Sequence, residues 1–218
     1  SPVPFAGSVG SGAHQHLSLQ RDGEPLFSGG QGARGMRPGG EAAVAGLLNG
    51  LPEAQAVLCG SILSGLRMQP GSWSGASVCW GTENREAGVR FLSGGPGNPH
   101  GANVEVKVVD PSANPYFATA AILGLALDGI ERELPLAPEV PVDPSTLSLD
   151  ERDRAGIVLL SADQTVTVDA LAGSTLLRAI LGDAAVDSVV AVRRYEVEHY
   201  GDLSPEQLAE KFRLAWSV

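Results

Sequence analysis

The chain has 218 residues, of which 43% are hydrophobic, and a formal net charge of -10 at pH 7. That length and apolar content suffice for one domain, or two small ones, with a buried core. The net charge lies entirely in residues 110–218, because residues 1–109 hold seven acidic and seven basic residues. The acidic half argues against nucleic acid or an anionic membrane as a partner. A site for an anionic ligand is therefore expected in the neutral half.

Apolar runs and cysteines predict a cytoplasmic protein that does not enter a membrane. The most apolar helix candidate, residues 116–127, is too short to cross a bilayer. The spacing of Cys59 and Cys79 matches no zinc or redox motif. We therefore expect two buried thiols in a reducing compartment.

Residues 1–66 predict a strand followed by two helices. Gly10–Ala13 lead into a strand over residues 13–19, where a period of two places His14, His16 and Ser18 on one face. A turn at Asp22-Gly23 and a glycine-rich loop over residues 28–40 follow. Apolar spacing predicts a helix over 41–51, and Pro52 is placed in the first turn of a second helix reaching residue 66.

The next segment predicts short strands over residues 77–81, 88–92 and 103–109. In the third strand, Val104, Val106 and Val108 alternate with polar residues and are expected to face a core. Glu105 and Lys107 then lie on the opposite face. The alternation alone favours a solvated outer face for these two charges.

The rest of the chain predicts helices. Asn114-Pro115 indicates the start of a helix reaching residue 133 that is apolar nearly all round and so buried. A proline-rich connector covers residues 134–144. Helices are expected over residues 171–181, 184–200 and 204–216, the last with a capping box at Ser204. Residues 145–218 carry no special motif and are expected to be scaffold.

Several motifs in one order resemble the glutamine synthetases. They are Gly10-Ser11-Gly12-Ala13-His14-Gln15-His16-Leu17-Ser18-Leu19, Arg67-Met68-Gln69-Pro70-Gly71, Asn84-Arg85, Val89-Arg90, Asn103-Val104-Glu105-Val106-Lys107, and Asp110-Pro111-Ser112-Ala113-Asn114-Pro115-Tyr116. Order and spacing agree with the family across residues 1–133, and the tail from Asp169 agrees more loosely.

The resemblance implies a role for each matching residue. His14 would bind one divalent ion, Mg²⁺ or Mn²⁺, and Glu105 another. The nucleotide, ATP, would lie near His16 and Ser18, with Arg85 and Arg90 on its phosphates. Because phosphoryl transfer to a carboxylate brings two anions together, metal ions and guanidinium groups are needed to offset their charge. The implied catalytic residues are Arg67 and Arg85, and the implied substrate-binding residues are Gly10, Arg67, Trp73 and Lys107.

The chain departs from the family pattern mainly on the substrate side. Trp73 stands in the loop where the family usually has a glutamate that positions and deprotonates ammonium. Lys107 stands where an arginine is usual, and lysine cannot form a bidentate fork to a carboxylate. Val9 and Asn103 replace a usual asparagine and arginine. These changes indicate an acceptor amine larger than ammonia.

We therefore expect an α+β fold in which helices at 41–66 and 115–133 back an antiparallel sheet, with a helical C-terminal part. Residues 1–218 are interpreted as one fragment of a catalytic domain, with the site in 1–133 and a connector and helices in 134–218. The family's small N-terminal domain and remaining metal carboxylates would lie upstream, so the fragment alone is expected to be inactive. The resemblance also implies a ring-forming homo-oligomer.

The function expected for the complete protein is ATP-dependent ligation of a glutamate-like acid to ammonia or an amine through an acyl phosphate. One alternative is a non-catalytic structural relative that keeps the fold, and acidic ligands upstream would distinguish the two. Another is a metal-dependent hydrolase built on His14 and His16. That alternative needs further ligands within the chain, and the sequence offers no suitable histidine or cysteine cluster.

Overall fold

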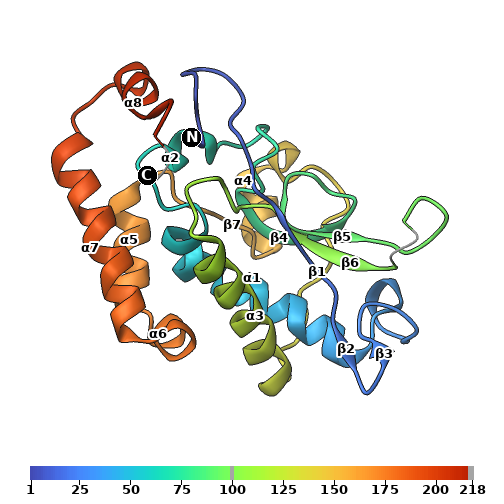
Figure 1. The fold of residues 1–218 in the computed structure, drawn as a ribbon. Coiled ribbons are helices and arrows are strands. Elements are labelled where there is room, and N and C mark those ends of the chain that lie inside the picture. The colour runs from blue at the N-terminus through green and yellow to red at the C-terminus, as the bar shows by residue number, and fades with distance from the viewer. Residues whose placement is uncertain (99–100, 216–218) are drawn as a thin grey trace.

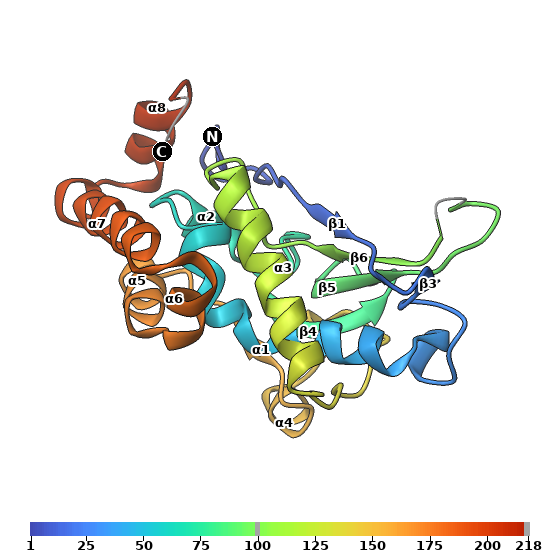
Figure 2. The same cartoon turned by 60° about the horizontal axis from the view of Figure 1, so that its bottom comes forward.

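The computed structural model describes residues 1–98 and 101–215 and has the expected α+β architecture. A five-stranded sheet runs in the order β1-β6-β5-β4-β7, and helices α1 and α3 lie between it and the C-terminal helices (Figures 1 and 2). The strands of this sheet are β1 (Gln15–Leu17), β4 (Ser77–Thr82), β5 (Ala87–Leu92), β6 (Asn103–Val106) and β7 (Val158–Leu159). A separate two-stranded ribbon pairs β2 (Gln20–Arg21) with β3 (Glu24–Pro25).

The sheet is antiparallel at every pairing but one. β1 pairs with β6, β6 with β5, and β4 with β7 in antiparallel fashion. β4 and β5 pair in parallel, with a shift of register between Ser77 and Trp80, so a wholly antiparallel sheet was a wrong expectation. Apolar alternation is the same in both pairing directions, and the short connection over residues 83–86 is typical of antiparallel neighbours.

Helix α1 (Pro38–Leu58) is one continuous helix, which corrects the prediction of two helices divided at Pro52. An interior proline costs a helix roughly 3 kcal/mol, because it lacks the N–H group and its ring crowds the preceding turn. Most of α1 is nevertheless buried, including Leu47 and Leu51 in the main core. Tertiary burial therefore outweighs the local penalty. The only helix in residues 59–69 is the short α2 (Ser64–Arg67).

Helices α1 and α3 (Pro115–Glu131) pack at backbone distance. A Cβ on Gly46 would lie 2.2 Å from the Leu125 carbonyl oxygen, and one on Gly129 would lie 2.2 Å from the Ala42 carbonyl oxygen. Such contact is open only to glycine. The start of α3 is the predicted one, because the Asn114 side chain accepts hydrogen bonds from the amides of Tyr116 and Phe117.

The proline-rich segment 134–144 has no helix or strand before the 3-10 turn at Pro144–Thr146, in agreement with the prediction. It runs along β4, where Trp80 Nε1 donates to the Ala137 carbonyl at 2.8 Å. The sequence pattern missed α4 (Leu149–Arg154) and β7. Among the described residues, no helix is both long and apolar enough to cross a membrane. Cys59 and Cys79 are both buried, as predicted.

The C-terminal helices differ from the predicted ones at their boundaries. The helix expected over 171–181 is two helices, α5 (Gln164–Gly173) and α6 (Thr175–Leu181), because Ser174 caps α6 by accepting from the Leu177 amide. Helix α7 covers Asp183–Tyr200. The predicted capping box at Ser204 is present, but α8 (Pro205–Phe212) ends before the predicted boundary at Trp216, which lies outside the described residues.

Candidate active site

A row of three polar side chains crosses the sheet from β1 to β5. In the strand register, His16 of β1 lies opposite Glu105 of β6, and Glu105 lies opposite Arg90 of β5. Residues that pair in this way across neighbouring strands share one face of a sheet. Three segments that are far apart in the sequence therefore supply one polar row.

His14 precedes β1 and joins this row through Glu105. Its Nδ1 lies 2.7 Å from Glu105 Oε1, and His16 Nε2 lies 3.9 Å from the same oxygen. His16 Nδ1 is hydrogen-bonded to Asn103 Oδ1 at 2.8 Å. Two imidazoles and a carboxylate thus converge, as period two along the segment predicts. Ser18 is exposed beyond the end of β1.

Glu105 is buried, with only 4% of its surface exposed, which corrects the solvated face that alternation alone favours. Its second oxygen, Oε2, accepts from Arg90 Nη1 at 3.2 Å. Burial acts to raise its pKa, but the His14 hydrogen bond and the charges of Lys107, His14 and Arg90 outweigh burial and lower the pKa to about 2. The carboxylate is therefore ionised at neutral pH.

Basic residues lie close to this carboxylate. Lys107 is buried as well, and burial lowers its pKa. The negative charge of Glu105 opposes this shift, and the positive charges of Arg90, Arg67 and Arg85 lower the pKa of Lys107 further. Arg90 also forms an ion pair with Glu83. Lys107 and Arg90 thus lie near the buried Glu105 carboxylate, and Arg67 and Arg85 lie close enough to Lys107 to affect its pKa. Arg85 itself is exposed in the turn between β4 and β5.

Arg67 and Gly10 lie against each other beside the end of β6. A Cβ on Gly10 would lie 2.9 Å from Arg67 Cγ, so the close approach requires glycine. The buried Arg67 guanidinium donates to the carbonyls of Val108 at 2.9 Å and Lys107 at 3.1 Å. Burial lowers the pKa of Arg67, and Asp110 opposes that shift. The two residues that the resemblance assigns to the acid substrate are therefore neighbours.

The residues present fit part of a divalent-ion site. Carboxylate oxygen and imidazole nitrogen both bind Mn²⁺ and Mg²⁺, and such ions take about six ligands. Among residues 1–98 and 101–215, no group of three or more histidine, cysteine or acidic side chains is arranged to hold a metal ion alone. His14 and Glu105 could therefore hold such an ion only as part of a larger coordination shell.

The loop that carries Trp73 lies at the rim of this region. Trp73 is 59% exposed and adopts a left-handed backbone with φ of 53°, between Gly71 at 78° and Gly75 at 73°. Its indole borders a cavity of about 300 Å³ with the turn 82–86 and residues 141–143. At this exposure, Trp73 does not pack against the sheet.

Glu86 is a functional candidate that the sequence reasoning missed. It is only 5% exposed, and its carboxylate accepts from the amides of Gly71 at 3.1 Å and Trp73 at 2.6 Å. The sole sequence signal is its place directly after Asn84-Arg85, because a contact made to a loop's backbone leaves no side-chain pattern.

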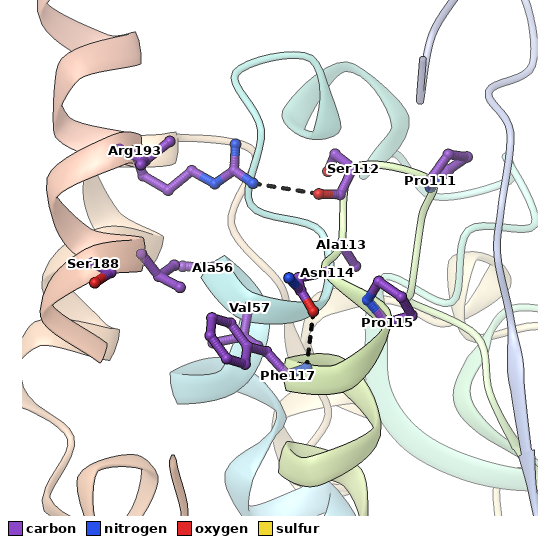
Figure 3. A pocket seen from close by; sticks show the side chains of 12 residues that line it. Ala56, Val57, Pro111, Ser112, Ala113, Asn114, Pro115, Phe117, Ser188 and Arg193 are labelled. Atoms are coloured by element: carbon purple, nitrogen blue, oxygen red, sulfur yellow. Dashed lines mark hydrogen bonds between the residues drawn. The ribbon is translucent and has the colours of Figure 1, made fainter. Parts of the chain in front are cut away.

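A second cavity, of about 390 Å³, lies away from these residues between α1, the start of α3 and α7 (Figure 3). Its walls are mostly apolar and include Val57, Phe117 and Val192. Arg193 at its edge donates to the Ser112 carbonyl at 3.4 Å and pairs with Glu196 at 2.5 Å. None of the predicted site residues lines this cavity. The charged side chains His14, Glu105 and Arg90 converge instead on the sheet.

Comparison with known proteins identifies the family of the chain. Residues 1–210 match the family model described as glutamine synthetase, catalytic domain. The chain is 37% identical over 214 residues to a gamma-glutamylpolyamine synthetase of Streptomyces coelicolor, covering 98% of this chain and 46% of that protein. It is 34% identical over 201 residues to the glutamine synthetase of Pyrococcus abyssi, covering 91% and 44%. The chain thus spans less than half the length of these relatives.

Solved structures give the same result. A crystal structure of a novel glutamine synthase homolog has a TM-score of 0.80 and 33% identity, covering 97% of this chain and 47% of that one. A complex of GmaS with ADP has a TM-score of 0.77 and 28% identity, covering 93% and 46%. The chain belongs to the glutamine synthetase family, and its first 210 residues match the catalytic domain of that family.

Proposed function

We propose that the protein carrying this chain is an ATP-dependent carbon–nitrogen ligase that joins a glutamate-like acid to an organic amine. The observation that carries the proposal is the buried Glu105, held by His14 on one oxygen and by Arg90 on the other. A buried carboxylate with an imidazole and cations around it suits the binding of a metal–nucleotide complex.

In this proposal the metal ion supplies charge neutralisation, and His14 and Glu105 hold it from this chain. In this structure the two side chains are hydrogen-bonded to each other at 2.7 Å, so both would be close to a bound ion. Arg90, and Arg85 in the exposed turn, neutralise phosphate charge. Arg67, beside Gly10, faces the acid substrate. Each of these groups reduces the repulsion between the phosphoryl donor and the substrate carboxylate.

The chemistry divides into two balanced steps. The substrate carboxylate attacks the γ-phosphorus of ATP, which gives an acyl phosphate and releases ADP. The amine nitrogen then attacks the acyl carbon, inorganic phosphate leaves, and the nitrogen loses a proton to a base or to solvent. Activation is needed because a carboxylate carries no leaving group that an amine could displace.

The acceptor is proposed to be an organic amine because of Trp73. Ammonium is small and needs an anionic group to hold it and take its proton. An exposed indole instead offers an apolar and cation–π surface, which suits an alkyl or aromatic amine. A relative named gamma-glutamylpolyamine synthetase supports such an acceptor.

Phosphate release by the complete gene product tests this function. The assay supplies ATP, Mg²⁺ or Mn²⁺, glutamate and a panel that contains ammonia, monoamines and polyamines. We expect an organic amine to give the highest kcat/KM, and Trp73→Glu to move the preference toward ammonia. If ammonia gives the highest value and Trp73→Glu does not improve it, the acceptor assignment is wrong. No phosphate release with any nitrogen nucleophile in the panel would favour the non-catalytic structural relative.

The family also supports a ring-forming homo-oligomer located in the cytoplasm, and we propose both for the complete protein. Sedimentation velocity of the complete gene product tests the assembly. A monomer at micromolar concentration would contradict the ring.

A further inference from the structure

Glu86 clamps the Trp73 loop through the main chain. Both oxygens of its buried carboxylate accept amide hydrogens of the loop, one from Gly71 and one from Trp73. Hydrogen bonds from backbone amides to a carboxylate are among the stronger ones in proteins, because the acceptor is charged. The clamp therefore holds the backbone on both sides of Ser72.

Glu86 is itself held in place by the turn before β5. Its amide donates to Asn84 Oδ1 at 3.1 Å, and Asn84 Nδ2 donates to the carbonyls of Val140 and Val142, each at 2.9 Å. The carboxylate is thus anchored to the connector as well as to the sheet. The loop is therefore held in a fixed position relative to the connector and to β5.

The loop needs an external anchor because its backbone is unfavourable. Trp73 has φ of 53°, a left-handed conformation that a residue with a Cβ rarely adopts. Gly71 and Gly75, at 78° and 73°, supply the other two left-handed positions at no steric cost. Without the Glu86 contacts, Trp73 would relax toward a right-handed or extended backbone, and its indole would leave the cavity rim.

We propose that Glu86 is a positioning residue that sets acceptor specificity by fixing the Trp73 indole beside the amine. This inference rests on the proposed function and deepens it. An indole held before the substrate arrives loses little conformational freedom on binding, so its contact with the amine contributes more to affinity. Glu86 has no direct contact with the amine in this proposal, because its two oxygens are occupied by amides.

A double-mutant cycle on the complete gene product tests the proposal. The variants are Glu86→Gln, Trp73→Ala and the double variant. Glutamine keeps one acceptor oxygen and turns an NH₂ group toward the other amide, so it breaks the clamp with little change in volume. We expect Glu86→Gln to lower kcat/KM for the preferred amine roughly tenfold, mainly through KM, and to change it less than about twofold in the Trp73→Ala background. KM for ATP and glutamate should stay within about twofold.

Glu41→Gln is the matched control. Glu41 accepts the amide of Ala33 at 2.8 Å in another glycine-rich loop, so its variant breaks a similar contact elsewhere. We expect its amine KM to equal that of the wild type. If Glu86→Gln does not fold, as judged by near-UV circular dichroism, Glu86→Asp retracts the carboxylate with its charge intact and enters the same cycle.

The outcomes separate this proposal from the proposed function. An equal loss with Glu86→Gln in both backgrounds, or a loss in kcat alone, would mean that Glu86 acts on the reaction without Trp73, and the proposal fails. If the wild type turns over no amine, the proposed ligase function is wrong. The fluorescence of Trp73 then tests separately whether Glu86 holds the loop. The Trp73 contribution is obtained by subtracting the emission spectrum of the matching Trp73→Phe variant from that of the protein that keeps Trp73. We expect Glu86→Gln to shift it, and an unchanged signal would overturn the clamp.

Discussion

Glu105 Oε1 lies 2.7 Å from His14 Nδ1, although 91 positions separate the two residues in the chain. The contact depends on the antiparallel pairing of β1 with β6, which places His16 opposite Glu105 and brings His14 within reach. Because Arg90 occupies the other oxygen, the carboxylate is ionised and oriented before any ligand arrives. The site is thus arranged in advance by the sheet.

Metal binding by residues 1–218 alone is expected to be weak. This chain offers His14 and Glu105, whereas a hard divalent ion needs about six ligands. Calorimetry with Mn²⁺ and ATP should give a dissociation constant above 1 μM, and His14→Ala should weaken binding further. Sub-micromolar binding by this chain would mean that the remaining ligands are not needed. The complete gene product should lose phosphate release with a chelator and regain it with added metal.

Arg90→Lys should lower kcat/KM of the complete gene product by roughly tenfold or more. The Arg90 guanidinium bridges Glu83 and Glu105, and an ammonium group cannot hold both carboxylates in one planar fork. Steady-state phosphate release measures the loss. Arg178→Lys is the matched control, since Arg178 bridges Asp183 and Asp187 at an exposed helix junction. Equal activity of the two variants would contradict a role for Arg90 at the site.

Gly46→Ala should destabilise the fold by about 1–3 kcal/mol or more, since its Cβ would meet the Leu125 carbonyl at 2.2 Å. Gly173→Ala is the control within another helix. Nothing lies within 4 Å of a Cβ there, and alanine is the better helix former. Urea unfolding followed by circular dichroism should show a lower midpoint for Gly46→Ala and an equal or higher one for Gly173→Ala. Equal midpoints for both variants and the wild type would refute the close helix contact.

Glu139 should make stability depend on pH. Burial acts to raise its pKa, but hydrogen bonds from Arg34 and Thr82 outweigh burial and hold the pKa below 4.5. A carboxyl whose pKa is depressed on folding adds stability above its unfolded pKa, and this is lost as pH falls toward the folded value. Glu139→Gln should therefore lower the unfolding free energy by about 1 kcal/mol at neutral pH.

The difference between wild type and Glu139→Gln should narrow as pH falls below 4.5, the ordinary value for this carboxyl. Denaturant unfolding at pH 7, 5 and 3.5 measures it. Glu131→Gln, at an exposed position of α3, should match the wild type throughout. A gap between wild type and Glu139→Gln that stays constant across these pH values would show that the Glu139 charge contributes nothing.

Sequence reasoning predicted the parts of the fold that depend on local pattern. The Asn114 cap and the alternation of Val104 and Val106 follow from spacing and period. The convergence of His14 with Glu105 follows from strand alternation combined with the family resemblance. The continuity of α1 through Pro52 did not, because burial of the whole helix outweighs a local rule. The helix end at Ser174 was missed because the apolar pattern continues across it. The structure places the side chains of the site, and the metal-, nucleotide- and substrate-binding roles assigned to all of the site residues stay predictions.

Glu86 is the candidate site residue that was found only in the structure, because its side chain contacts the main chain of the loop rather than other side chains. Glu86 contacts backbone amides, which every residue has, so no residue type at positions 71 or 73 signals it. Arg90 was found from its motif, but its bridge between Glu83 and Glu105 depends on strand register. The sequence motifs therefore predicted which residues belong to the candidate site, whereas the pairing of the strands determines which of their side chains are in contact.

Strand β5 connects the two sides of the site. Glu86 directly precedes β5 and holds the Trp73 loop by its backbone. Arg90 lies within β5, beside Glu105. Four residues of extended chain span roughly 13 Å. Adding or deleting one residue between them would turn Arg90 to the opposite face, because side chains alternate along a strand. A change in the length of this segment would therefore break the link between the loop held by Glu86 and the contact of Arg90 with Glu105, whereas a substitution would keep the alternation that both depend on.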